Sequence, residues 1–207
     1  MKYFRLALVS VSLLASQACD RYVAQAKKTV FVPWEEGLTL IYENPVESPS
    51  KGTQGRLQVR VASSKEAPEG RTIGITYTTF QGQMNADFLN KEGGWVLKTA
   101  GKSFTILPEG FPDRVNTWGD PNRGMTCRII GRASLMNSDL KLPDDFDRTG
   151  IWVESESMQG TKSRTFFLPN IGEVQRTELN KDGQWVLVNQ LVSRGFTDAP
   201  VVKSDKQ

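Results

Sequence analysis

The feature that most constrains the fold of this chain is a nine-residue segment that occurs twice. The sequence LNKEGGWVL at residues 89–97 returns as LNKDGQWVL at residues 179–187, an offset of 90 residues, with seven of the nine positions identical. An Asn followed by two helical-type residues and a Gly is the pattern of a type I turn closed by a G1 bulge. Each copy is therefore predicted to join two antiparallel strands of a β-hairpin.

Matches outside this turn indicate that a longer unit is duplicated. Glycines and aromatic residues align at the same offset of 90, and residues 37–39 align with residues 124–126 at an offset of 87. The aligned pairs are Gly70 with Gly160, Tyr77 with Phe167, and Gly82 with Gly172. A common turn could arise twice by chance, but collinear matches favour duplication. We predict one β-domain, residues 31–207, built of two repeats at about 31–115 and 116–205.

Alternation of apolar and small polar residues predicts β-strands. In residues 72–78, Ile73, Ile75 and Tyr77 alternate with Thr and Gly, which is the period-two pattern of a half-buried strand. Further strands are expected at 38–43, 56–62, 95–99, 103–107, 125–131, 151–156, 164–168, 173–178 and 185–193. Short strands separated by frequent turn signals predict an all-β fold, a duplicated antiparallel meander that forms a curved sheet, a half-barrel or a sandwich.

The first 18 residues have the order of a secretory signal peptide. Lys2 and Arg5 form a basic start, residues 6–15 form a mainly apolar stretch, and the sequence SQA at residues 16–18 fits a cleavage site. About ten apolar residues are too few to cross a bilayer, which needs about 20. We expect export to the bacterial cell envelope, with Cys19 as the first mature residue and residues 19–30 as a tether.

Cys19 has two possible fates. The sequence LASQAC at residues 14–19 resembles a lipobox, although Gln17 and Ser16 depart from its usual residues, and lipidation would anchor the protein to the inner or outer membrane on the periplasmic side. Alternatively, ordinary cleavage leaves a soluble periplasmic binding protein in which Cys19 forms a disulfide with Cys127, because the envelope is oxidising.

Net charge argues against nucleic acid as a partner. The chain has 26 Lys and Arg against 23 Asp and Glu, and removal of the leader takes away Lys2 and Arg5, which leaves a net charge of about +1. A protein that follows a phosphate backbone needs a basic stripe, whereas basic residues here are scattered among acids.

The residue inventory offers little catalytic chemistry. Histidine is absent, which excludes His-dependent triads and His-containing zinc sites. Glu154 and Glu156 share one strand face, so an alternative hypothesis is a carboxylate-dependent hydrolase of envelope glycans. Residues 144–147 contain three Asp but lack the Gly and Glu of an EF-hand calcium loop. We expect a non-enzymatic protein without cofactor or metal.

Five tryptophans could line an apolar cleft or stack on sugars. Trp95 and Trp185 hold equivalent positions after the repeated turn and are expected to be core or hairpin anchors. Trp118, in a loop that we expect to be exposed, and Trp152 are the candidate ligand-binding residues. The ligand would be lipid-like or apolar, and an envelope protein is the alternative partner.

Residues 166–176, FFLPNIGEVQR, resemble the aromatic-x-Pro-Gly-Val-Gly-x-Val-Lys/Arg segment of uncharacterised bacterial envelope β-domain families, with Asn170 in place of the expected Gly. The segments at 32–39, 130–132, 142–146 and 152–154 precede it in the order that those families show. These families often have a curved antiparallel sheet similar to that of periplasmic lipoprotein carriers. The resemblance implies a fold and an envelope location, and it assigns no activity.

Overall fold

The computed structural model describes residues 30–32, 34–45, 55–99, 102–122, 124–136, 140–142 and 146–196. The predicted signal peptide, Cys19 and nearly all of the tether lie outside these residues, as do Asp144 and Asp145. Within the described part of the chain, no helix has the length and apolar character that a transmembrane span requires.

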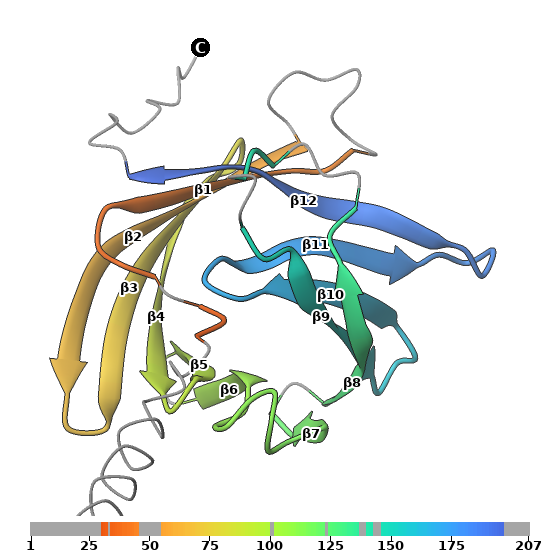
Figure 1. The fold of residues 1–207 in the computed structure, drawn as a ribbon, viewed down its shortest axis with the longest axis horizontal. Coiled ribbons are helices and arrows are strands. Elements are labelled where there is room, and N and C mark those ends of the chain that lie inside the picture. Colours follow the sequence, from red (N-terminus) through yellow and green to blue (C-terminus); the bar gives the residue numbers. More distant parts are fainter. Residues whose placement is uncertain are drawn as a thin grey trace, which may run out of the picture.

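Twelve antiparallel strands form a single sheet that curls into a nearly closed, barrel-like shape (Figure 1). This confirms the predicted all-β fold and the curved sheet. The strands are β1 (Leu38–Glu43), β2 (Arg56–Ala67), β3 (Gly70–Thr79), β4 (Gly82–Lys91), β5 (Gly94–Thr99), β6 (Lys102–Leu107), β7 (Thr117–Asp120), β8 (Met125–Ser134), β9 (Thr149–Ser157), β10 (Lys162–Leu168), β11 (Gly172–Leu179) and β12 (Trp185–Phe196).

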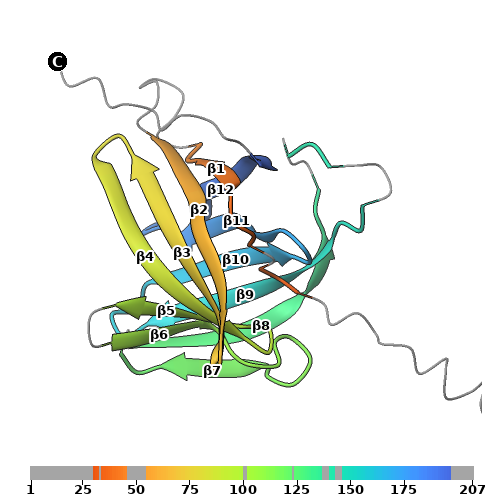
Figure 2. The same cartoon turned by 90° about the vertical axis from the view of Figure 1, so that its left-hand side faces the viewer.

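Two meanders meet in the middle of the sheet. Its strand order is β6-β5-β4-β3-β2-β1-β12-β11-β10-β9-β8-β7, so the pairing of β1 with β12 joins the first half of the chain to the second. The terminal strands β6 and β7 lie side by side where the curl nearly closes (Figures 1 and 2). Asn122 Nδ2 donates a hydrogen bond of 2.9 Å to the backbone oxygen of Ser103 across this seam.

The expected strands are present, and most are one to five residues longer than predicted. Two strands go beyond the expectation. Strand β4 is mostly polar at its start, and its side chains there are exposed. Strand β7 lies in the segment that we expect to be an exposed loop, and it places Trp118 in the core, 8% exposed. A four-residue strand beside a proline carries too few residues to show periodicity.

The two copies of the repeated turn differ in conformation. At the second copy, Asn180 O accepts a hydrogen bond from Gly183 N, whose φ is 75°, as predicted for a type I turn with a G1 bulge. At the first, Lys91 pairs directly with Gly94, and both Glu92 and Gly93 have positive φ, 48° and 81°. Positive φ at both central residues defines a two-residue type I′ turn, so the prediction for residues 90–93 is wrong.

Glycines that align between the repeats share an unusual backbone. Gly82 and Gly172 have φ values of 135° and 105°, and Gly93 and Gly183 have values of 81° and 75°. Residues with side chains rarely adopt such angles, so the recurrence of glycine has a conformational cause. This similarity favours the duplication, which stays a prediction.

The N-terminal segment of the domain crosses the concave side of the sheet (Figure 1). Phe31 and Trp34 are 2% and 7% exposed, and Phe31 packs edge to face on Phe111 with ring centroids 5.1 Å apart. Asn170 N donates to Val30 O at 2.8 Å, which ties the segment to the β10–β11 turn. Burying an aromatic side chain stabilises by roughly 1.5–3 kcal/mol, so this segment helps to hold the two halves together.

Candidate functional site

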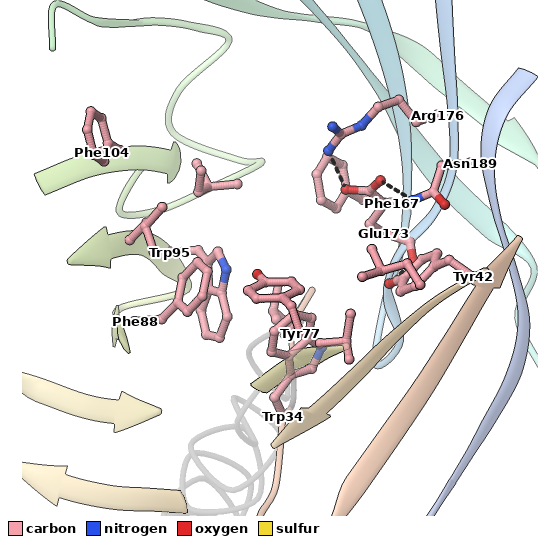
Figure 3. Close-up of a pocket in the computed structure, with 15 residues that line it drawn as sticks. Trp34, Tyr42, Tyr77, Phe88, Trp95, Phe104, Phe167, Glu173, Arg176 and Asn189 are labelled. Atoms are coloured by element: carbon pink, nitrogen blue, oxygen red, sulfur yellow. Dashed lines mark hydrogen bonds and ion pairs between the residues drawn. The ribbon is translucent and has the colours of Figure 1, made fainter. Parts of the chain in front are cut away.

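A cavity of about 440 Å³ lies inside the curve of the sheet, between residues of β1–β6 and residues of β10–β12 (Figure 3). This volume falls in the range of about 300–1,000 Å³ that is usual for small-molecule sites. Apolar and aromatic side chains make up most of its wall. The lining residues are Val32, Trp34, Tyr42, Leu57, Val59, Tyr77, Phe88, Trp95, Leu97, Phe104, Ile106, Phe167, Glu173, Arg176 and Asn189.

One end of the cavity is an aromatic cluster. Trp95, the second residue of β5, stacks on Phe88 of β4 with centroids 4.8 Å apart and meets Trp34 edge to face at 4.9 Å. Gly94 precedes Trp95 because a Cβ there would lie 2.9 Å from the backbone nitrogen of Glu109. Offset and edge-to-face pairs each add about 0.5–1.5 kcal/mol beyond burial, so this end of the wall is preorganised.

The opposite end is polar (Figure 3). Arg176 Nη2 forms an ion pair of 2.9 Å with Glu173 Oε2, and Asn189 Nδ2 donates to Glu173 Oε1 at 3.4 Å. The hydroxyl of Tyr42 donates to the backbone oxygen of Glu173 at 3.0 Å. These groups bring two charges and several hydrogen-bonding atoms to one wall of an otherwise apolar cavity.

A β-bulge puts Glu173 and Arg176 on the same face of β11. Residues an odd number apart on a regular strand point to opposite faces. Phe166 pairs with Gln175, but Phe167 pairs with Glu173, so β11 carries one extra residue, Val174. The extra residue reverses the alternation, which lets both charged side chains enter the cavity.

The tyrosines of the cavity keep their protons at neutral pH. The pKa of Tyr77 is raised to about 12, first by burial and then by the Glu173 carboxylate, while Arg176 lowers it. The pKa of Tyr42 is raised well above its ordinary value by the same two causes, burial first. Glu173 also raises the pKa of the Arg176 guanidinium. The wall therefore offers neutral phenols beside one carboxylate and one guanidinium.

The predicted ligand-binding tryptophans lie away from this cavity. Trp118 is buried and packs edge to face on Phe111 at 5.8 Å, and the half-buried Trp152 on β9 lies 5.0 Å from the ring of Phe166. Neither lines the cavity. The contact of these two tryptophans with a ligand stays a prediction. The two fates proposed for Cys19 also stay predictions. Cys127, which pairs with Trp118 across β7 and β8, is buried.

The candidate acids of the hydrolase hypothesis are held in ion pairs. Arg128 and Arg164 approach Glu154 at 2.6 and 2.9 Å, and hydrogen bonding to Arg128 is the main cause that lowers the pKa of this carboxyl. Glu156 pairs with Lys162 at 3.4 Å. A general acid needs a raised pKa, so the geometry at Glu154 is that of a structural ion pair.

The Asp-rich loop is described in part. Asp147 Oδ1 accepts a hydrogen bond of 2.8 Å from the backbone nitrogen of Thr149, and this bond lowers the pKa of Asp147. No group of three or more potential ligand residues suited to a metal ion occurs within the described residues.

The cavity residues give a weak signal in the sequence. Trp95 is the hairpin anchor expected from its position, and it also lines the cavity. The alternation around Tyr77 shows which residues share its face, but it does not show that the face is concave. Glu173 and Arg176 could not be placed together, because the bulge between them reverses the alternation.

Comparison with known proteins supports the fold. No protein-family model matches the sequence, and no curated protein does. An exported protein with a YmcC-like fold from Bacteroides fragilis is similar in structure with a TM-score of 0.53 and 13% sequence identity, over 81% of this chain and 99% of that chain. The two chains therefore share a fold. A lipoprotein from Parabacteroides distasonis has a TM-score of 0.48 and 12% identity over the same share of this chain.

Proposed function

We propose that this protein is an exported, lipid-anchored, non-enzymatic protein of the bacterial cell envelope whose β-domain binds an apolar, lipid-like ligand. The observation that carries the proposal is the cavity inside the curved sheet, with an aromatic end and a polar end. An amphiphile has the same two-part chemistry. The predicted leader, and the description of the Bacteroides fragilis protein as exported, support an envelope location.

Native mass spectrometry of the protein isolated from its own envelope tests for the ligand. The wild-type spectrum should show bound mass that organic extraction removes. In the variant Leu97→Arg, a charged side chain enters the cavity wall, and the bound mass should disappear. Val96→Arg is the matched control, because the neighbouring residue does not line the cavity. A wild-type spectrum with no bound mass contradicts the proposal.

The intact mass of the mature N-terminus tests the anchor. Lipidation predicts a chain that begins at Cys19 and carries an acyl adduct, and substitution Cys19→Ser should release the protein from membranes. An unmodified chain two hydrogens lighter than its sequence would instead show the Cys19–Cys127 disulfide of a soluble protein. That result would overturn the anchor and leave the ligand proposal standing.

A further inference from the structure

The polar wall of the cavity carries one charge of each sign. Glu173 and Arg176 are the charged residues among the described side chains that line the cavity, and they bind each other at 2.9 Å. Arg176 keeps 44% of its side-chain surface accessible although protein surrounds it, because it lies in the wall of an open cavity. The wall is therefore neutral in sum and rich in hydrogen-bonding groups.

The cavity also has a direction. Trp34, Phe88 and Trp95 gather at one end, Glu173 and Arg176 lie at the other, and the ring of Tyr77 lies between them (Figure 3). An amphiphile would bury its tail against the aromatic end, where removal of apolar surface from water is favourable. Its head group would then reach the polar wall.

The charges on this wall disfavour a charged head group. An anionic head group would lie beside the Glu173 carboxylate, and Arg176 already forms an ion pair with that carboxylate. The exposed Glu178, two residues along β11, adds negative potential near Arg176. A cationic head would in turn lie beside the guanidinium. A like charge placed in such a site is costly.

An uncharged polar head finds suitable partners on the same wall. Arg176 directs Nη2 to Glu173, and a guanidinium carries five N–H donors in all, so others can serve a ligand oxygen. The Tyr77 hydroxyl keeps its proton and can donate or accept. The side-chain oxygen of Asn189 can accept from a hydroxyl or amide.

We propose that the cavity selects amphiphiles whose head group is uncharged and carries hydroxyl, ester or amide groups, with Glu173 and Arg176 as the residues that set this selectivity. The inference rests on the proposed function, because it presupposes that the cavity holds an apolar tail.

Three probes with the same tail length and different head charges test the selectivity. Dodecanoyl glycerol, dodecanoate and dodecylamine are titrated below their micellar concentrations into delipidated full-length protein, and tryptophan fluorescence and calorimetry follow binding. The wild-type protein should bind dodecanoyl glycerol at least about tenfold more tightly than either charged probe, which corresponds to about 1.4 kcal/mol.

Single substitutions should move the selectivity in opposite directions. Glu173→Gln leaves Arg176 unbalanced, so affinity for dodecanoate should rise about tenfold relative to dodecanoyl glycerol. Arg176→Gln leaves the charge of Glu173 unbalanced, so affinity for dodecylamine should rise by a similar factor relative to dodecanoyl glycerol. The double variant restores neutrality and should again prefer dodecanoyl glycerol. Circular dichroism and thermal unfolding establish that each variant is folded.

The outcomes separate this inference from the proposed function. If none of the three probes binds the wild-type protein, both fall. If all three bind with affinities within about threefold, the apolar cavity stands and the selectivity proposal is overturned. If wild-type selectivity is present but neither single variant changes it, the head group does not lie at Glu173 and Arg176, and the proposal is again overturned.

Discussion

At the scale of single residues, the carboxylate of Glu154 shows how an acid on a strand can be structural. The Glu154 side chain is 8% exposed, yet the arginines that cover it are 63% and 37% exposed. The Glu154 carboxylate is therefore covered by charged side chains at the surface and not by residues of the hydrophobic core. Trp185 adds to this arrangement, since the guanidinium carbon of Arg164 lies 3.9 Å from the centroid of its ring.

Removal of this carboxylate should reduce stability in a pH-dependent way. Because the folded-state pKa of Glu154 is lowered, its contribution is present above the unfolded-state pKa of about 4.3 and is lost as the pH falls through the folded value. Glu154→Gln should lower the free energy of unfolding by about 1 kcal/mol at pH 7, since the partners are partly exposed. Urea unfolding at pH 7 and pH 3 measures this.

The matched control is Glu156→Gln on the same strand, whose ion pair with Lys162 is exposed on both sides. We expect it to change the free energy of unfolding by less than about 0.5 kcal/mol. If the difference in free energy of unfolding between wild type and Glu154→Gln stayed constant down to pH 3, the ion pairs of Glu154 would not be the cause of that difference.

At the scale of elements, the two repeated turns share seven of nine residues but not a conformation. Glu92 has a φ of 48°, a backbone angle that residues other than Gly, Asn and Asp rarely adopt. Asp182, at the equivalent position, does not have a positive φ, and its backbone nitrogen donates to Asn180 Oδ1 at 3.0 Å. The two segments differ in sequence only here and at Gly94 and Gln184, so the residues that change lie in or next to the turn.

The turns make a comparative prediction. Glu92→Asn creates the Asn-Gly pair that type I′ turns prefer and should raise the free energy of unfolding by about 0.5–1 kcal/mol. Asp182→Asn should leave it unchanged within about 0.3 kcal/mol, because that residue has an ordinary backbone conformation. Thermal and urea unfolding of the two variants compare these effects. Equal effects of both substitutions would contradict the difference between the turns.

Strands with clear alternation could be predicted from the sequence, and the remaining elements could not, for physical reasons. The segment 72–78 alternates because one of its faces is buried, as Ile73 and Ile75 show. Strand β4 is exposed over much of its length, so its start carries no apolar stripe. The bulge at Val174 is a difference in strand pairing, which leaves no trace in the local sequence of β11.

At the scale of the whole molecule, the closeness of β6 and β7 makes a cavity possible. Curvature brings strands from opposite ends of the sheet together, and the wall with Phe88 and Trp95 then faces the wall with Glu173 and Arg176 (Figures 2 and 3). Periodicity could predict the faces of these strands but not the degree of curl, which depends on twist and bulges along the sheet. The candidate site therefore could not be predicted from the sequence.

The distribution of tryptophans over the molecule allows the ligand to be located. Trp34 and Trp95 line the cavity, whereas Trp118, Trp152 and Trp185 do not. Bromine atoms quench tryptophan emission at contact distance, so a dibrominated monoacylglycerol reports which tryptophans it touches. A double variant with Trp34→Phe and Trp95→Phe preserves the aromatic wall and removes the two tryptophans whose emission reports contact with the ligand.

Quenching by this brominated probe is the most direct test that the ligand occupies the cavity. We predict that the probe quenches wild-type emission, that a non-brominated monoacylglycerol competes it away, and that quenching is lost in the double variant while calorimetry still detects binding. Quenching that persists unchanged in the double variant, and disappears when Trp118 and Trp152 are replaced by Phe instead, would contradict the account and place the ligand elsewhere on the sheet.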